Sequence, residues 1–418
     1  MSPLTRAFRS RVGGALAAVA TTAALVLAGA PVAQAEDVRA RQWYLDAMKA
    51  EEMWKVSTGK GITVAVLDSG VDPTVPELRG KVQVGADFTA DVPDGSEGGA
   101  ETVQHGTNMA AYIAGTGAAG GIKGLAPDAR ILSVKVATSD MKGVFGLAGV
   151  LSKAIRHAVD EGSRIINISM VTSSVTGQEA ELQAAVDYAL RKGTLIFAGT
   201  GNDGAEFVQY PAVVPGVVAV GALDTRGKVA KFSNYGDHVA LAAAGVELAG
   251  RCESDRTQFC AKDGTSGATA IASASAALIW SAHPDWTGNQ VLRVMMETAG
   301  RNGPVPSKYI GFGGVRPAQV LLEGKGDPGP ADVNPLLAAR EQASPAPGDS
   351  AAPRNSPSAA STGAAGDNGT SKGSQAAPET AAKSGEGGFP LWAIVASAVA
   401  VVTVIGAVVA VSVRRRRA

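Results

Sequence analysis

Short, almost entirely apolar runs alternate along this chain with longer stretches in which apolar residues recur every three or four positions. The short runs predict buried strands at 62–67, 131–136, 164–169 and 195–198. The longer stretches predict helices at 108–115, 150–159 and 179–191. Strands that alternate with helices favour a parallel sheet. The pattern therefore predicts an α/β fold with a doubly wound parallel sheet and helices on both faces.

Residues 264–280 stand apart from this alternation. A glycine turn, Gly264-Thr265-Ser266-Gly267, leads into small and apolar residues with no polar face. Such a helix is expected to lie buried in a large core. Ser266 falls in its first turn, where unpaired N–H groups and the positive end of the helix dipole favour a serine nucleophile. Serine is also a common helix cap, so both roles stay open at this point.

Polar side chains follow two of the predicted strands. Asp68 comes directly after the strand at 62–67, and Asn202 lies in the glycine loop after the strand at 195–198. Ligands and catalytic groups gather at the carboxyl ends of parallel strands, so both residues are candidates for the site. Both residue types are also ordinary turn formers.

His105 is the preferred base among the four histidines. It opens a helix between glycine-rich sequence and a Gly-Thr pair, as a site residue at a helix start would. His157 lies on the face of an amphipathic helix, and His238 and His283 adjoin turns.

Four motifs resemble those of the subtilisin-like serine proteases, the subtilases. They are Asp68-Ser69-Gly70, His105-Gly106-Thr107, Gly201-Asn202 and Gly264-Thr265-Ser266. Their order along the chain, Asp then His then Ser, is also that of the family and differs from the Ser-first order of α/β-hydrolases. The resemblance covers residues 42–322.

The resemblance implies a role for each of these residues. Ser266 is the expected nucleophile, His105 the general base and Asp68 the residue that orients the imidazole. Asn202 and the Ser266 N–H are the expected oxyanion donors. The resemblance also assigns substrate binding to Ser169, Met170, Val171, Gly199, Thr200 and Gly201.

Five residues depart from the family pattern. Gly267 and Ala270 replace the usual Met and Pro around the serine, and Asn108 and Ala111 replace residues common after His-Gly-Thr. Val171 stands where glycine is frequent, and its isopropyl group is expected to narrow the primary pocket. This predicts cleavage after small residues.

Charge and cysteine content narrow the class of protein. The 38 basic and 38 acidic residues balance, but seven arginines lie in the two terminal segments, so the middle of the chain is acidic and offers no nucleic-acid surface. Cys252 and Cys260 are the only cysteines, and after a secretory signal they predict a disulfide, with two free thiols as the alternative. No metal site or cofactor is predicted, because no acidic loop has EF-hand spacing.

The ends of the chain predict a membrane-anchored organisation. The expected segments are a signal peptide at 1–35, a peptidase domain at 36–324, a disordered Pro/Ala/Gly/Ser-rich linker at 325–388, a transmembrane helix at 389–413 and a basic tail at 414–418. By the positive-inside rule the tail is cytoplasmic and the peptidase domain extracellular. The residues between 36 and Asp68 are too few for a folding prodomain, so the segment around Trp43 is expected to pack on the domain.

This organisation resembles that of the mycosins, the membrane-anchored subtilases of bacterial type VII secretion systems. Gln42-Trp43-Tyr44-Leu45 and the cysteine pair fit that subgroup. The resemblance implies peptide or protein substrates, a single-pass membrane protein and a type VII secretion complex as partner. A catalytically silent subtilase fold that stabilises a secretion complex is the alternative function, whereas an adhesin is disfavoured because the chain has no repeats.

Overall fold

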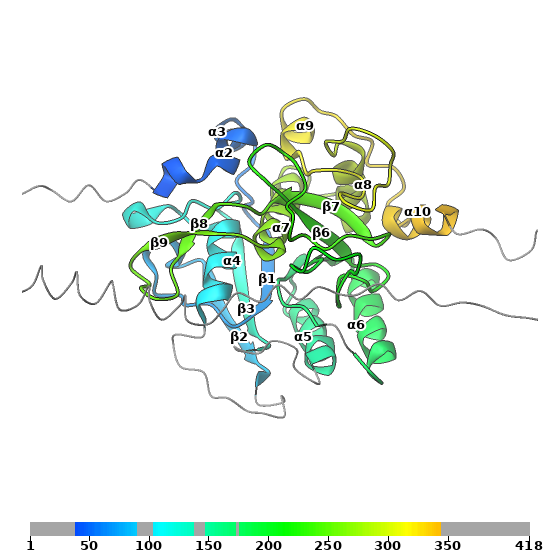
Figure 1. The fold of residues 1–418 in the computed structure, drawn as a ribbon, viewed down its shortest axis with the longest axis horizontal. Coiled ribbons are helices and arrows are strands. Elements are labelled where there is room, and N and C mark those ends of the chain that lie inside the picture. The colour runs from blue at the N-terminus through cyan, green and yellow to red at the C-terminus, as the bar shows by residue number, and fades with distance from the viewer. Residues whose placement is uncertain (1–37, 90–102, 138–146, 173–174, 344–418) are drawn as a thin grey trace, which may run out of the picture. The chain divides into compact units, whose positions relative to one another are not determined.

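A seven-stranded parallel sheet forms the centre of the computed structural model, which describes residues 38–89, 103–137, 147–172 and 175–343 (Figure 1). Its strands are β1 Thr63–Asp68, β2 Val82–Asp87, β3 Arg130–Lys135, β4 Ile165–Ile168, β5 Leu195–Gly199, β6 Val218–Leu223 and β7 Val239–Ala244. They lie in the order β2-β3-β1-β4-β5-β6-β7, and every pairing is parallel. The predicted parallel α/β sheet is confirmed.

Helices cover both faces of this sheet (Figure 1). Helices α4 (Gln104–Ala114) and α7 (Thr265–Ala282) pack on one face, and α5 (Leu147–Asp160) and α6 (Glu179–Arg191) pack on the other. Alternate residues of β1 accordingly enter two separate cores: Val64 joins the α4 and α7 side, and Ala65 joins the α5 and α6 side. Burial on both faces explains why strands such as β1, β4 and β5 are nearly continuous apolar runs, whereas the edge strand β2 is partly exposed and mixed in sequence.

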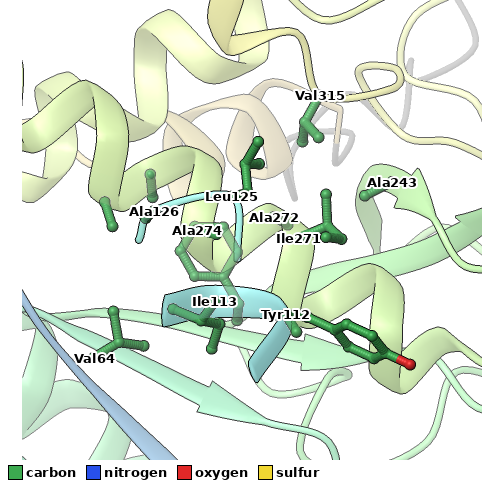
Figure 2. Close-up of a cluster of buried hydrophobic side chains, with 14 of the residues drawn as sticks. Val64, Tyr112, Ile113, Leu125, Ala126, Ala243, Ile271, Ala272, Ala274 and Val315 are labelled. Atoms are coloured by element: carbon green, nitrogen blue, oxygen red, sulfur yellow. The ribbon is translucent and has the colours of Figure 1, made fainter. Parts of the chain in front are cut away.

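Helix α7 is the predicted buried helix. Every residue from Gly267 to Trp280 is buried, and Figure 2 shows Ile271, Ala272 and Ala274 inside an apolar cluster. Behind α7 lie α8 (Gly288–Glu297) and α9 (Pro317–Leu321), so the helix has packed neighbours on all sides. Its small side chains allow this close approach, and hydroxyls such as that of Ser275 donate back to the carbonyl four residues earlier.

The remaining elements surround this core. They are η1 Val38–Arg41, α2 Trp43–Ala47, α3 Ala50–Met53, η2 Pro76–Leu78, η5 Ala118–Gly120, the hairpin strands β8 Leu248–Arg251 and β9 Phe259–Lys262, and α10 Pro335–Ala343. Helix α10 lies beyond the predicted domain boundary at residue 324, and its Leu336 is buried in the core. The packed part of the chain therefore includes residues that the sequence assigns to the linker.

Several predicted segments fall outside the described residues. These are the signal peptide at 1–35, most of the linker, the transmembrane helix at 389–413 and the basic tail at 414–418. Within the residues that the structure does describe, no helix combines the length and apolarity needed to cross a bilayer.

Candidate active site

The candidate residues meet at the carboxyl edge of the sheet. Asp68 is the last residue of β1, Ser169 follows β4 directly, and Asn202 lies three residues after the end of β5. Strand β1 is flanked by β3 and β4, which both come later in the chain, so the strand order changes direction here. Such a switch point is where α/β sheets form their crevices.

Asp68 and His105 form a direct pair. The Asp68 Oδ1 atom accepts a hydrogen bond from His105 Nδ1 at 2.8 Å and another from the Ser69 N–H at 2.7 Å. Because an ionised carboxylate only accepts, Nδ1 carries the proton, and in the neutral imidazole Nε2 keeps its lone pair. Asp68 is fully buried, whereas the His105 side chain stays 36% exposed. The imidazole can therefore act as a base on a ligand.

Gly106 permits this contact between α4 and β1. A Cβ atom at this position would lie 2.2 Å from the Gly70 carbonyl oxygen and 3.1 Å from Asp68 Oδ1. A real side chain does not fit there, so only glycine lets the start of α4 approach the end of β1 this closely.

The surroundings of His105 raise the pKa of its imidazole. Burial lowers the pKa of the imidazole, but the charge of Asp68 and its hydrogen bond raise that pKa by more. The net pKa lies above the ordinary value of 6.5. The carboxylate thus both orients the ring and stabilises its protonated form.

Ser266 lies in the first turn of α7 but does not cap it. Its hydroxyl donates to the Ser169 carbonyl oxygen at 3.2 Å, and Gly264 holds the N-cap position without a side-chain cap. Ser266 and His105 line the same cavity of about 250 Å³. Within the described part of the chain, no hydrogen bond joins the Ser266 hydroxyl to His105.

The Asn202 side chain and the Ser266 backbone place two nitrogen donors beside one space. The Asn202 Oδ1 atom accepts from the Thr265 N–H at 2.8 Å and the Thr265 hydroxyl at 3.0 Å, which fixes the amide orientation and leaves Nδ2 as a donor. A Cβ atom on Gly264 would lie 3.7 Å from both Asn202 Nδ2 and Ser266 N. The space beside Gly264 is therefore flanked by two donors and kept open by the missing side chain. Such an arrangement suits a developing oxyanion.

The loop that carries Asn202 needs glycine at position 201. Gly201 has φ +110°, and a Cβ there would lie 2.3 Å from Gln209 Oε1 and 2.4 Å from Asn234 Nδ2. Asn234 also accepts from the Asp203 N–H at 2.8 Å and so shapes the same loop. The sequence did not predict this role of Asn234.

The predicted substrate-binding residues have unequal exposure. Gly199, Thr200 and Gly201 are buried, as is Ser169, whereas Met170 and Val171 are partly exposed. The segment from Ser169 to Val171 lies between the end of β4 and Thr172, which pairs with Tyr210. Only part of this set is accessible to a ligand.

A disulfide-linked hairpin packs against α4. Cys252 and Cys260 are joined as predicted, directly after β8 and within β9. The Asn108 side chain pairs with the backbone of Arg251, accepting from its N–H at 2.8 Å and donating to its carbonyl oxygen at 3.2 Å. Asn108, a departure from the family pattern, thus ties the helix that carries His105 to this hairpin.

A buried ion pair joins the hairpin to η2, and a close packing contact joins it to α7. Arg251 makes two hydrogen bonds to the fully buried carboxylate of Glu77, at 2.9 and 2.5 Å. A Cβ on Gly267 would lie 2.4 Å from Leu248 Cδ1. Leu248 of β8 therefore occupies the space that a side chain at position 267 would take, which accounts for a glycine where the family usually has Met.

The described residues contain no group of three or more His, Cys, Asp or Glu side chains that could hold a metal ion.

Comparison with known proteins shows similarity across the whole of the parallel sheet. The model of the subtilase family matches residues 59–313. The chain is 36% identical to the thermophilic serine proteinase of Bacillus sp. (strain AK1), over 54% of this chain and 54% of that protein. It is 33% identical to subtilisin BL of Lederbergia lenta, over 58% of this chain and 84% of that protein. The match thus spans about half the length of the first relative.

Solved structures add a narrower similarity. MycP1 from Mycobacterium smegmatis superposes with a TM-score of 0.60 at 28% identity, over 70% of this chain and 86% of that one. The MycP3 protease from the type VII (ESX-3) secretion system superposes with a TM-score of 0.57 at 30% identity, over 67% of this chain and 87% of that one.

Proposed function

The chain belongs to the subtilase family, and from this premise we propose that it is a serine endopeptidase with Asp68, His105 and Ser266 as its catalytic triad. The observation that carries the proposal is the 2.8 Å bond between Asp68 Oδ1 and His105 Nδ1, with Ser266 on the same cavity. In the neutral imidazole that bond keeps the proton on Nδ1, so His105 Nε2 can accept the proton of a nucleophile.

The proposed reaction begins at the Ser266 hydroxyl. Rotation about χ1 turns Oγ from the Ser169 carbonyl oxygen toward His105, whose Nε2 takes the proton as Oγ attacks the peptide carbonyl. The carbonyl oxygen becomes an oxyanion beside Gly264, where Asn202 Nδ2 and the Ser266 N–H donate to it.

The same imidazole completes both halves of the reaction. Its proton passes to the leaving amine, which frees the new N-terminus and leaves an acyl-enzyme on Ser266. Water then attacks the acyl group, giving a proton to His105 Nε2, and Ser266 regains its hydroxyl as the acid product leaves. Asp68 stays ionised and stabilises the imidazolium in each step.

The substrate is proposed to lie as an extended segment along Ser169 to Val171. Met170 and Val171 are the partly exposed residues of this segment, and the isopropyl group of Val171 limits the room for the side chain before the scissile bond. The proposed enzyme therefore cleaves after small residues.

Hydrolysis of a peptide pool tests this function. The full-length chain, purified in detergent because of the predicted span at 389–413, is incubated with peptides of varied sequence beside its Ser266→Ala variant. Cleavage by the wild type alone, after Ala, Ser or Gly, is the expected result. Cleavage after Phe or Tyr would disprove the narrow pocket, and no cleavage by correctly folded wild type would favour the silent scaffold.

The setting of the peptidase is proposed to be a bacterial membrane. Two proteins of similar structure, MycP1 and MycP3, come from type VII secretion systems, and the sequence predicts a span at 389–413 with the domain outside. We therefore propose a membrane-anchored enzyme that processes proteins passing through such a system. External protease digestion of intact cells tests the topology, since it removes the domain only if the domain is extracellular.

A further inference from the structure

One hairpin contacts both the segment after β1 and the start of α4, which carry the acid and the base of the site. The β8–β9 hairpin lies beside α4 (Figure 1), and its Arg251 backbone pairs with Asn108, one helical turn after His105. The turn between its two strands carries Arg256, whose guanidinium donates to the Asp72 carboxylate in an ion pair. Asp72 lies four residues after β1 ends, so the hairpin reaches both segments.

The two segments are also joined directly to each other. The Asp72 N–H donates to the Thr107 hydroxyl oxygen at 2.9 Å, and that hydroxyl donates to the Val103 carbonyl oxygen at 2.7 Å. Thr107 is buried and lies two residues after His105. The position of Asp72 is therefore passed to the first turn of α4 through one hydroxyl group.

Arg256 fixes the Asp72 carboxylate from outside its own loop. The Oδ1 atom of Asp72 accepts from the Thr74 N–H at 2.8 Å and from the Thr74 hydroxyl at 2.6 Å, and the Oδ2 atom accepts from Arg256. The side chains of Arg256 and Asp72 are 29% and 17% exposed. Solvent and salt therefore screen this pair less than a fully exposed one.

The hairpin turn in its sequence and contacts holds Arg256 in place. Arg251 Nη1 donates to the Arg256 carbonyl oxygen at 2.7 Å, and the same guanidinium is anchored on the buried carboxylate of Glu77. The disulfide between Cys252 and Cys260 closes the loop that contains Arg256. The cation is thus presented to Asp72 by a braced turn.

We propose that Arg256 is a positioning residue for the catalytic base. Through Asp72 and Thr107, it keeps the first turn of α4, which carries His105, against the end of β1. The proposal rests on the proposed function for the role of His105, whereas the bond from His105 to Asp68 is present in the structure irrespective of turnover. Arg256 does not line the cavity that His105 shares with the serine, so it acts through the fold and not on substrate.

The pKa of His105 reports this alignment. NMR titration of the histidine rings in full-length Ser266→Ala protein measures it without turnover, and the signal that His105→Gln removes identifies His105 among the four histidines. Arg256→Ala is expected to lower the pKa toward 6.5, because the imidazole is no longer held on the Asp68 carboxylate. Loss of the arginine charge alone would raise the pKa instead, so the sign of the change separates the two effects.

Two matched variants show whether the effect comes from this ion pair. Arg256→Lys keeps a cation beside Asp72 and is expected to retain the raised pKa of His105. Arg226→Ala removes the arginine of another pair with a carboxylate, that of Asp224 in the turn after β6, and leaves the pKa unchanged. In the active enzyme, Arg256→Ala is expected to lower kcat by about tenfold and to leave KM unchanged.

A second variant breaks the same link without touching the hairpin. Thr107→Val removes the hydroxyl but keeps a side chain of similar size, and it is expected to lower the pKa of His105 as Arg256→Ala does. Glu253 and Lys262 of the hairpin also influence this pKa, and Thr107→Val leaves both in place. This variant keeps the proposal testable if Arg256→Ala does not fold.

An unchanged or raised pKa of His105 in the Arg256→Ala variant overturns the proposal. An unchanged pKa in the Thr107→Val variant overturns it as well, because the effect of Arg256 would then not pass through α4. Since the pKa is measured on Ser266→Ala protein, a wild type that cleaves nothing refutes only the peptidase function.

Discussion

The negative charge of Asp68 raises the pKa of His105. Because its pKa is raised above 6.5, His105 loses its proton at a higher pH than an ordinary histidine. We therefore expect kcat/KM to rise with pH through a half-point above 6.5, since only the neutral imidazole accepts the proton of Ser266. Initial rates between about pH 5 and 9 give this half-point. A half-point at or below 6.5 contradicts the proposed pairing.

Asp68→Asn provides the matched control for that profile. Removing the carboxylate leaves burial as the main influence on the His105 pKa, so the half-point is expected to fall, and activity drops by about 10⁴ as in other triads.

The raised pKa of His105 also makes the folding stability depend on pH. The protonated imidazole is stabilised in the folded state, so this contribution is fully present below the unfolded-state pKa and is lost as pH rises through the folded-state pKa.

Substitution of Asn202 tests the proposed oxyanion site. Asn202→Ala removes one donor and is expected to lower kcat by about 10²–10³ with little change in KM, the size of effect reported for the corresponding donor in subtilisin. Thr265→Ala removes only the hydroxyl that holds Asn202 Oδ1 and keeps the backbone N–H bond, so its loss is smaller. Steady-state kinetics of both variants check this order, and an Asn202→Ala enzyme with normal kcat would refute the assignment.

Residue identities in the site were predictable because each lies in a local motif. Asp68 ends an apolar run and His105 opens a helix, and both features are visible over a few residues. The support of Asn202 by Thr265 was not predictable, because it joins residues 63 positions apart through the fold.

At the scale of elements, the β8–β9 hairpin is joined to α4 through Asn108 and to η2 through Glu77. The Arg251–Glu77 pair buries two charges that satisfy each other, so removal of one leaves the other unpaired. We expect Arg251→Ala to lower the free energy of unfolding by about 3–5 kcal/mol. Lys308→Ala, which breaks an exposed pair with Glu206, is the control and has little effect. Urea unfolding followed by circular dichroism measures the free energy of unfolding of both variants. Equal losses in the two variants would contradict a stabilising role of the Arg251–Glu77 pair.

The sequence did not predict the strands of this hairpin. Strands β1, β3, β4 and β5 of the parallel sheet were visible because burial on both faces makes them largely apolar, whereas β2, which is partly exposed, and β7 were not predicted. The four-residue strands β8 and β9 carry mixed residues, and Arg251 is 143 positions from Asn108 and 174 from Glu77. Contacts at such separations leave no local pattern.

At the scale of the molecule, the N-terminal segment is part of the packed domain. Gln42 is fully buried and exchanges hydrogen bonds with the Lys123 backbone at 2.9 and 2.8 Å, and the Trp43 indole donates to the Val246 carbonyl oxygen at 3.0 Å. We expect the mature protein to begin before Gln42, and N-terminal sequencing checks this. A start well past Trp43 would show that the segment is removed.

Labelling with a fluorophosphonate probe tests the central claim most directly, because the probe reacts only with a serine that an assembled triad activates. The full-length protein is treated beside Ser266→Ala and His105→Ala variants, and the modified residue is mapped by mass spectrometry. The account predicts that the wild type alone is labelled, at Ser266. Correctly folded wild-type protein that stays unlabelled, or labelling that persists in the His105→Ala variant, would contradict it.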